Sequence, residues 1–253
     1  MLTAYYIGLA LIAFMGVSAF AATRKEPNHY GRYLGEGETR TVDARIGWLI
    51  FESPQWFAFA LTFWLTARAT NINSATIPLF ALWQGHYMYR ALVMPFLMRI
   101  GGKRLPLANI WYGLAFNSLN GFVNAYAVGH AEHLATAEWL SDPRFIAGIV
   151  IAATGWVINV HADNILFRLR KPGETGYRIP HGGMFRYVSS ANYLGEIVLW
   201  TGWALMTSTL AGLVFMLFTI ANLGPRAMSH HKWYRATFPD YPKDRKALIP
   251  GLL

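Results

Sequence analysis

Seven stretches of mostly apolar residues recur along the chain, each separated from the next by a short, more polar segment. Each stretch approaches the roughly 20 residues that a helix needs to cross a bilayer. The predicted spans are residues 3–22, 46–67, 76–98, 109–130, 145–167, 188–206 and 209–225. The short connection between the last two predicts a tight helical hairpin. The pattern therefore predicts an all-α, polytopic membrane protein that forms a single membrane domain over residues 1–253.

Basic residues gather in alternate connecting segments. Residues 23–45, 99–108 and 168–187, together with the C-terminal tail, hold 19 of the 22 lysines and arginines. The other connecting segments carry little positive charge and include acids such as Glu132 and Asp142. Because positively charged loops stay in the cytoplasm, the N-terminus is predicted to lie outside and the C-terminus inside. Termini on opposite sides of the membrane agree with the odd number of predicted spans.

Composition supports the membrane assignment and narrows the chemistry. Hydrophobic residues make up 54% of the chain and charged residues 14%, whereas a soluble domain carries about 25% charged residues. The absence of cysteine excludes disulfides, thiolate metal sites and a cysteine nucleophile. A net charge of +9 is a possible sign of nucleic-acid binding. Its placement on alternate loops is explained by membrane topology instead, so no nucleic-acid partner is expected.

Common soluble-enzyme motifs are missing from the sequence. There is no Walker A motif, no Gly-x-Gly-x-x-Gly fingerprint and no Gly-x-Ser-x-Gly elbow. The cluster of His130, Glu132 and His133 lacks the His-Glu-x-x-His spacing and falls on the predicted outer side, so no metal is expected. The connecting segments are too short to fold alone. Any ligand site must therefore be built from helices and the ends of loops.

Four ionisable residues interrupt the predicted spans: Glu52, Arg90, Asp163 and Glu196. Ionisable groups inside a membrane are costly and are by default candidates for a functional site. The structural alternative is that the four pair with one another as buried ion pairs. Both interpretations predict that they face the interior of the helical bundle.

The second span carries a polar and aromatic stripe around Glu52. Trp48, Glu52, Gln55 and Trp56 share one helix face, and Pro54 removes a backbone hydrogen bond beside them. A carboxyl group among aromatic side chains is disfavoured in its charged form, which makes Glu52 a candidate neutral proton donor. The alternative is a hydrogen-bonded residue at a helix kink.

The third span carries a comparable stripe. Trp83, Gln84, Tyr87 and Arg90 recur on one face. The phenol of Tyr87 is a candidate donor to a ligand carbonyl. The alternative is simple packing, because aromatic residues are common in membrane helices.

Polar residues also recur at helical spacing in the C-terminal half. Asn159 and Asp163 are four residues apart, and Asn192 and Glu196 repeat this arrangement. Farther along, Arg226, His230 and Tyr234 share one helix face. The loop between the fifth and sixth spans contributes Arg170, Lys171 and Arg178, which could bind phosphates or could only reflect the excess of positive charge in cytoplasmic loops.

Several of these segments together resemble the steroid 5α-reductase family. The resemblance is specific in the C-terminal half, at residues 169–174, 177–180, 182–183, 187–189, 191–196 and 241–250. In the N-terminal half it is confined to Glu52 with Pro54, and to His86 and Tyr87 with Arg90. It implies a seven-helix membrane enzyme that uses NADPH to saturate the Δ4 double bond of a 3-oxosteroid.

The resemblance also assigns roles to individual residues. Glu52 and Tyr87 match the catalytic pair that binds the substrate carbonyl. The positions assigned to the cofactor are Trp48, the nicotinamide-side residues Asn159, Asp163, Asn192, Glu196 and His230, and the phosphate-side residues Arg170, Tyr177, Arg178, Arg226 and Tyr234. Residues 1–140 would then supply the substrate pocket and residues 141–253 most of the NADPH site. One departure is Phe51, which stands where the family usually places Gln.

The family resemblance leads to the expectation of a monomer in a bacterial inner membrane or the endoplasmic reticulum, with its cofactor site facing the cytoplasm. Its partners would be a steroid or steroid-like substrate and membrane lipid. Phe51 makes the pocket wall more apolar, so a reductase of another lipid enone or of an enoyl substrate remains an alternative. A membrane transporter and a membrane methyltransferase are the alternatives from other classes. A transporter would be expected to show inverted repeats, and the sequence shows none.

Overall fold

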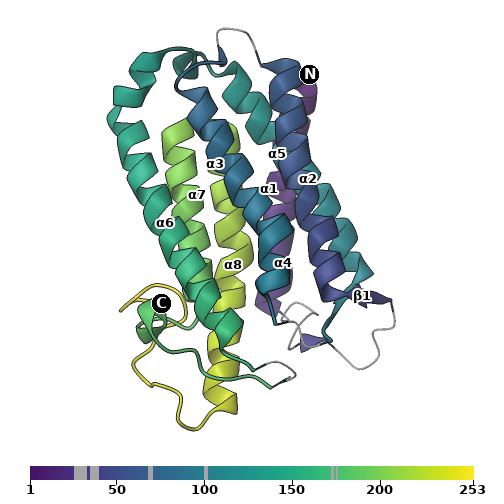
Figure 1. The fold of residues 1–253 in the computed structure, drawn as a ribbon, viewed down its shortest axis with the longest axis vertical. Coiled ribbons are helices and arrows are strands. Elements are labelled where there is room, and N and C mark those ends of the chain that lie inside the picture. The colour runs from purple at the N-terminus through teal and green to yellow at the C-terminus, as the bar shows by residue number, and fades with distance from the viewer. Residues whose placement is uncertain (26–32, 35–39, 68–70, 100–101, 172–173, 175) are drawn as a thin grey trace.

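The computed structural model describes the chain except for residues 26–32, 35–39, 68–70, 100–101, 172–173 and 175. It is mostly helical, and its long helices lie side by side (Figure 1). The helices that form the bundle are α1 (Leu2–Lys25), α2 (Ala44–Thr66), α3 (Thr76–Met88), α4 (Met94–Leu97), α5 (Leu107–His130), α6 (Pro143–Arg168), α7 (Ala191–Thr207) and α8 (Leu210–Thr237). A π-helical turn, η3 (Tyr89–Val93), joins α3 to α4. Short 3-10 helices η4 (Glu132–Ala135), η5 (Ala137–Ser141) and η6 (Gly183–Arg186) lie in the connections.

The seven apolar stretches correspond to seven helical segments, with α3, η3 and α4 together making the third. Most boundaries differ from the prediction by three residues or fewer, and two of the differences have a visible cause. Helix α7 begins at Ala191 rather than at residue 188, because the amides of Ser189 and Ser190 donate instead to carbonyls of the C-terminal tail. Helix α8 continues to Thr237 rather than ending at residue 225, because its last turns pack on that tail through Tyr234.

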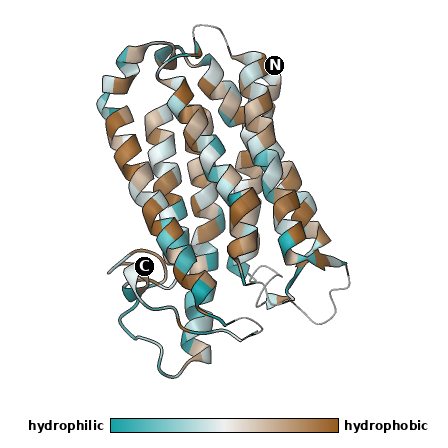
Figure 2. Cartoon of the chain, viewed as in Figure 1, coloured by the Kyte–Doolittle hydropathy of each residue, from teal (hydrophilic) through white to brown (hydrophobic). Residues whose placement is uncertain are grey.

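Among the residues that the structure describes, three helices are long and apolar enough to cross a membrane by length and composition: Leu2–Lys25, Pro143–Arg168 and Leu210–Thr237. Hydrophobic residues are concentrated along the helices, whereas many hydrophilic residues lie in the connections near the C-terminus (Figure 2). The two chain ends lie toward opposite ends of the bundle (Figure 1). These features are those of a membrane protein. The crossing by all seven segments and the orientation of the termini stay predictions.

A short antiparallel ribbon modifies the all-α expectation. Strand β1 (Thr41–Asp43) pairs with β2 (Arg104–Pro106), with Val42 opposite Leu105. Each strand leads directly into a helix, and the side chain of Asp43 accepts hydrogen bonds from the first amides of α2. The ribbon therefore fixes the starts of α2 and α5 beside each other.

Small residues let α6 and α7 approach closely. A Cβ atom added to Gly148, Gly155, Gly195 or Gly202 would come within 3.0 Å of the facing helix backbone. In membrane helices, small residues at an interface allow backbones to come together and gain van der Waals contact. This glycine seam, formed by the four glycines, holds together the two helices that carry most of the predicted nicotinamide-side residues.

Gly155→Ala is expected to lower the thermal midpoint of the detergent-purified protein. Its methyl group would meet the backbone of Leu199, and overpacking of a tight interface costs about 1–3 kcal/mol. The matched control is Gly224→Ala in α8, where an added Cβ meets nothing within 4 Å. Equal thermal midpoints for the two variants would contradict the importance of the seam.

Candidate functional site

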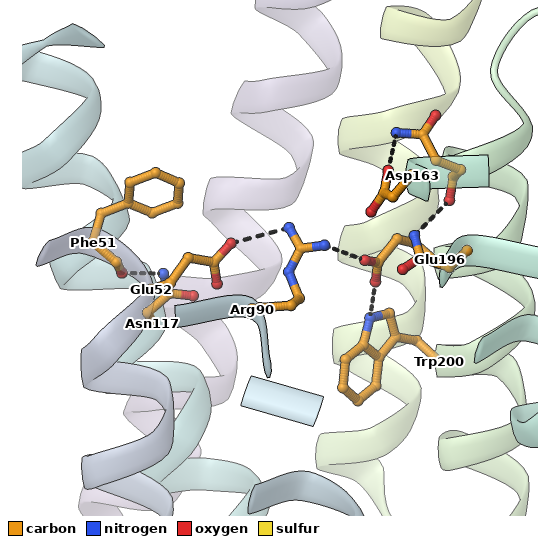
Figure 3. A network of polar contacts seen from close by, with 9 residues as sticks. Phe51, Glu52, Arg90, Asn117, Asp163, Glu196 and Trp200 are labelled. Atoms are coloured by element: carbon orange, nitrogen blue, oxygen red, sulfur yellow. Dashed lines mark hydrogen bonds and ion pairs between the residues drawn. The ribbon is translucent and has the colours of Figure 1, made fainter. Parts of the chain in front are cut away.

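An ion-paired network connects several helices of the bundle (Figure 3). Arg90 lies between two carboxylates on different helices: it donates to Glu52 Oε1 at 3.1 Å and to Glu196 Oε1 at 2.6 Å. All three side chains are largely buried. Three of the four ionisable residues that interrupt the apolar spans are thus joined directly, linking α2, η3 and α7.

A local irregularity of the helix carries Arg90. The residues from Tyr89 to Val93 form a π-helical turn, in which the amide of Met94 donates to the carbonyl of Tyr89, five residues earlier. Such turns insert an extra residue into an α-helix and are frequent at functional sites. The 3.6-residue periodicity of a regular α-helix does not predict this turn.

The network continues on α6 and α7. Trp200 Nε1 donates to Glu196 Oε2 at 2.9 Å. Asn192 Nδ2 donates to Asp163 Oδ1 at 3.2 Å, and Asn159 Nδ2 donates to the Asn192 carbonyl at 3.0 Å. The predicted nicotinamide-side residues of these two helices therefore meet beside the ion pairs. Three carboxyl groups lie near one guanidinium, since Asp163 also interacts electrostatically with Arg90.

Tyr87 is buried next to this network. Its ring stacks on Trp200 with a centroid distance of 5.6 Å and lies 5.1 Å from the ring of Trp83. The charges of Glu52 and Glu196 act on its phenol group. The structure thus brings Glu52 and Tyr87 to one place from two helices.

The structure pairs Glu52 with Arg90, whereas the protonation state of Glu52 stays a prediction. A carboxylate that accepts from Arg90 is an ion-pair partner, and this is the structural alternative for the intramembrane charges. Helix α2 runs as one helix through Pro54. One guanidinium balances only one carboxylate, so Glu52 and Glu196 together can still hold one proton between them.

Several buried polar atoms on α2 and α3 have no hydrogen-bond partner. Both amide atoms of Gln55 and Gln84, both ring nitrogens of His86, and the indole nitrogen of Trp48 are in this state. His86 is packed edge-on against Tyr87 and Trp200. Its burial was not indicated by the sequence, where it only adjoins Tyr87. Buried polar groups are normally hydrogen-bonded, so unpartnered ones mark places where a ligand or water can bind.

The predicted phosphate-side loop contacts the segment before β2. Lys103 Nζ donates to Tyr177 Oη at 3.0 Å and lies 4.4 Å from its ring centroid. The guanidinium of Arg99 donates to the carbonyl of Arg170, and one buried nitrogen of Arg170 has no partner. Arg178 is more exposed and pairs with Glu174 at 2.9 Å. Part of the loop motif, at residues 172–173 and 175, lies outside the described residues.

The three residues predicted to share one face of α8 do not all have the same neighbours. Arg226 and His230 both contact the ring of Tyr193, at 5.7 and 5.5 Å. Tyr234 is buried and stacks on Tyr241 of the tail at 5.3 Å. The structure therefore brings Arg226 and His230 together, whereas Tyr234 also anchors the tail.

A buried polar cluster holds the tail against the loop before α7. Ser189 Oγ lies 2.6 Å from both His231 Nδ1 and Tyr241 Oη, and it donates to the Lys246 carbonyl at 3.1 Å. Val188 forms a parallel bridge with Lys246. No local pattern in the sequence indicates this cluster, because Ser189 is 42 or more residues from each of its partners.

The histidines of the predicted outer side bind backbone groups. His130 Nδ1 lies 2.9 Å from the Tyr126 carbonyl, and His133 Nε2 lies 2.8 Å from the Thr207 carbonyl. Within the part of the chain that the structure describes, no three His, Asp or Glu side chains form a group suited to a metal ion.

Comparison with known proteins gives a consistent result over nearly the whole chain. A family model described as 3-oxo-5-alpha-steroid 4-dehydrogenase matches residues 103–253. The human 3-oxo-5-alpha-steroid 4-dehydrogenase 1 is 41% identical over 249 residues, which cover 96% of this chain and 95% of the human protein. The mouse enzyme of the same name is 42% identical, with coverages of 97% and 93%. The pig 3-oxo-5-alpha-steroid 4-dehydrogenase 2 is 40% identical, with coverages of 96% and 94%.

The regions matched by the full-length relatives include both the N-terminal and the C-terminal residues of the polar network. The N-terminal residues Glu52 and Arg90 precede the region matched by the family model, but the full-length relatives extend over nearly all of the chain. Identity of about 40% at this coverage shows the family as well as the fold. The chain therefore belongs to the 3-oxo-5-alpha-steroid 4-dehydrogenase family of steroid 5α-reductases, oxidoreductases that act on CH–CH bonds.

Proposed function

We propose that this protein uses NADPH to reduce the Δ4 double bond of a 3-oxosteroid to the 5α-3-oxosteroid. The observation that carries the proposal is the continuous polar network from Glu52 and Arg90 to Glu196, with Tyr87 packed beside it. It connects the predicted carbonyl-binding residues with the predicted nicotinamide side. The names of the relatives support the steroid substrate class.

The chemistry of the donor set fits NADPH. Arg170 has a buried guanidinium nitrogen without a partner, Trp48 has an unpartnered buried indole N–H, and Arg226 is a half-buried cation. Guanidinium groups suit phosphates because they offer several donors in a fixed geometry. The residues that would hold the phosphates are Arg170, Tyr177, Arg178, Arg226 and Tyr234. Those that would hold the nicotinamide end are Trp48, Asn159, Asp163, Asn192, Glu196 and His230.

When bound, NADPH supplies the hydride that reduces the β-carbon of the enone. Negative charge then grows on the ketone oxygen, and Tyr87 donates a hydrogen bond to that oxygen. A donor placed where charge develops lowers the barrier, as in an oxyanion hole. Protonated Glu52 supports Tyr87 in polarising the ketone, with Arg90 balancing the charge on Glu196. The buried aromatic rings of Trp83 and Trp200 keep Tyr87 in position and exclude water.

The direct test is incubation of the purified protein with NADPH and a panel of Δ4-3-oxosteroids. The expected product is two hydrogens heavier by mass spectrometry. The panel should include a Δ4 steroid without the 3-oxo group, which should not react, and a non-steroidal lipid enone. The second compound matters because Phe51, which packs against Trp48 at 4.8 Å, makes this wall apolar. Reduction of the lipid enone alone would assign a different substrate.

Arg226→Ala is expected to weaken NADPH binding by about tenfold or more while changing the steroid KM little. A hydrogen bond to a charged group contributes about 1.5–3 kcal/mol. Arg235→Ala is the control, because Arg235 is an exposed arginine near the end of the same helix. Isothermal titration with NADPH measures both variants without relying on turnover. Unchanged affinity in Arg226→Ala would remove this residue from the cofactor site.

We also propose seven membrane crossings by a monomer, with the N-terminus outside, the C-terminus in the cytoplasm and cofactor entry from the cytoplasmic side. The basic segments at alternate connections support this arrangement. Tags at the two ends should be accessible from opposite faces of sealed vesicles. Accessibility of both tags from one face would contradict the proposed topology.

A further inference from the structure

Gln55 is a fully buried amide whose hydrogen-bonding capacity is unused. It lies three residues after Glu52 on α2, its side chain is 0% exposed, and neither its nitrogen nor its oxygen has a hydrogen-bond partner. An amide can make up to four hydrogen bonds, and leaving them unmade in the interior is unfavourable. A ligand atom that satisfies this amide would therefore bind favourably.

Contacts from two other helices hold the backbone of Gln55. Its carbonyl accepts a hydrogen bond from Trp83 Nε1 at 3.3 Å. Gly121 of α5 also packs closely there, since an added Cβ would lie 2.9 Å from the same carbonyl oxygen. Trp83 also contacts Tyr87, four residues farther along α3. The position of Gln55 relative to Tyr87 is thus set by direct contacts between three helices.

Gln55 therefore lies one helical turn after Glu52, and the ring of Trp83 contacts both its carbonyl and Tyr87. A ketone oxygen has two lone pairs, and Tyr87 can donate to only one of them. Arg90 contacts one oxygen of Glu52 and one oxygen of Glu196. The amide N–H of Gln55 is a neutral donor that needs no change in the ion pairs to reach the second lone pair.

We propose that Gln55 is a catalytic residue that donates its amide N–H to the substrate ketone together with Tyr87. The inference rests on the proposed function and adds a specific donor to it. As hydride reaches the β-carbon, the C=C electron pair shifts toward the carbonyl and negative charge grows on oxygen. Gln55 stabilises that charge and gives up no proton. The α-carbon later takes a proton from water.

The kinetic test is single-turnover reduction by Gln55→Leu, compared with Asn120→Leu. Asn120 is a matched control because it is a fully buried amide on α5 whose nitrogen also lacks a partner. Gln55→Leu should reduce the rate by about 10²-fold, as for the loss of an oxyanion donor, with NADPH affinity unchanged. Asn120→Leu should stay within a few-fold of the parent protein. Equal losses in both variants, or no loss in Gln55→Leu, would overturn the assignment to Gln55.

An infrared measurement tests the contact without turnover. A Δ4-3-oxosteroid carrying ¹³C at the ketone is bound to the protein with NADP⁺, and its C=O stretch is recorded. Two donors should lower the frequency, and Gln55→Leu should raise it toward the free value, with a further rise when Tyr87→Phe is added. An unchanged frequency in Gln55→Leu would mean that the amide holds water or remains unpartnered, and would reject the proposal.

The two measurements separate the possible failures. A parent protein that binds the steroid but does not reduce it would refute the proposed function, while the infrared comparison would still decide whether Gln55 contacts the ketone. If Gln55→Leu yields too little folded protein, Gln55→Met preserves the length of the side chain and removes the donor. Both variants are compared as folded protein that still binds NADPH.

Discussion

Tyr87→Phe is expected to lower the single-turnover rate of steroid reduction by about 10²-fold or more, with NADPH binding nearly unchanged. The substitution removes only the phenolic donor and keeps the ring that stacks on Trp200. Its effect should fall on the transition state, because the charge on the ketone oxygen is largest there. Stopped-flow measurement on folded, NADPH-bound protein separates this effect from binding. A parent-like rate would show that another group holds the ketone.

Variants of Glu52 test its partnership with Tyr87. Glu52→Gln should be milder than Glu52→Ala if the carboxyl group works as a neutral donor, because the amide can still donate. A purely structural Glu52 would instead reduce the amount of folded protein in both variants, since its removal leaves Arg90 with one carboxylate fewer. Comparing rate per folded molecule with the yield of folded protein distinguishes the two roles.

Arg90→Met should cause the largest loss of stability among single substitutions of the network. It removes the cation that balances both Glu52 and Glu196, and breaking a buried ion pair by deleting one partner costs about 3–5 kcal/mol. The expected result is a large fall in thermal midpoint and in the yield of monodisperse protein. Adding Glu52→Gln and Glu196→Gln to the same chain should restore part of the stability, because no carboxylate is then left uncompensated.

An exposed ion pair supplies the control for this experiment. Arg144 pairs with Asp142 at 2.8 Å near the start of α6, where the arginine side chain is 55% exposed. Hydrogen bonds from Arg144 lower the pKa of Asp142 to about 2, so this pair remains ionised at neutral pH. Arg144→Met should nevertheless change the thermal midpoint little, because solvent screens exposed pairs. A comparable loss in both variants would mean that burial is not what makes Arg90 critical.

The sequence could predict the parts of the molecule that depend on local pattern. Apolar runs of helical length indicated the seven segments, since burial in lipid requires long continuous stretches. The cost of intramembrane charge singled out Glu52, Arg90, Asp163 and Glu196 before any contact was known. The structure joins the first two to Glu196 through ion pairs and connects Asp163 through Asn192.

The remaining features depend on contacts between distant residues or on departures from regular periodicity. Arg90 is 38 residues from Glu52 and 106 from Glu196, so helix periodicity says nothing about which acids it meets. The π-helical turn at Tyr89–Val93 and the ribbon between β1 and β2 leave no repeat in the hydropathy pattern. Gln55 could be placed on the stripe of Glu52, but only the packing of the helices shows that Trp83 connects it to Tyr87.

The contact between the tail and the loop before α7 has a consequence for biosynthesis. The amide of Ser189 and its hydroxyl both depend on the Lys246 carbonyl, which the ribosome adds 57 residues later. Helices α6 and α7 can pair through their glycines during translation, but the loop between them cannot reach its final form until that later segment has been made. Maturation of the predicted cofactor side is therefore a late, post-insertion event, and a nascent chain arrested before Tyr241 should be inserted but unable to retain NADPH.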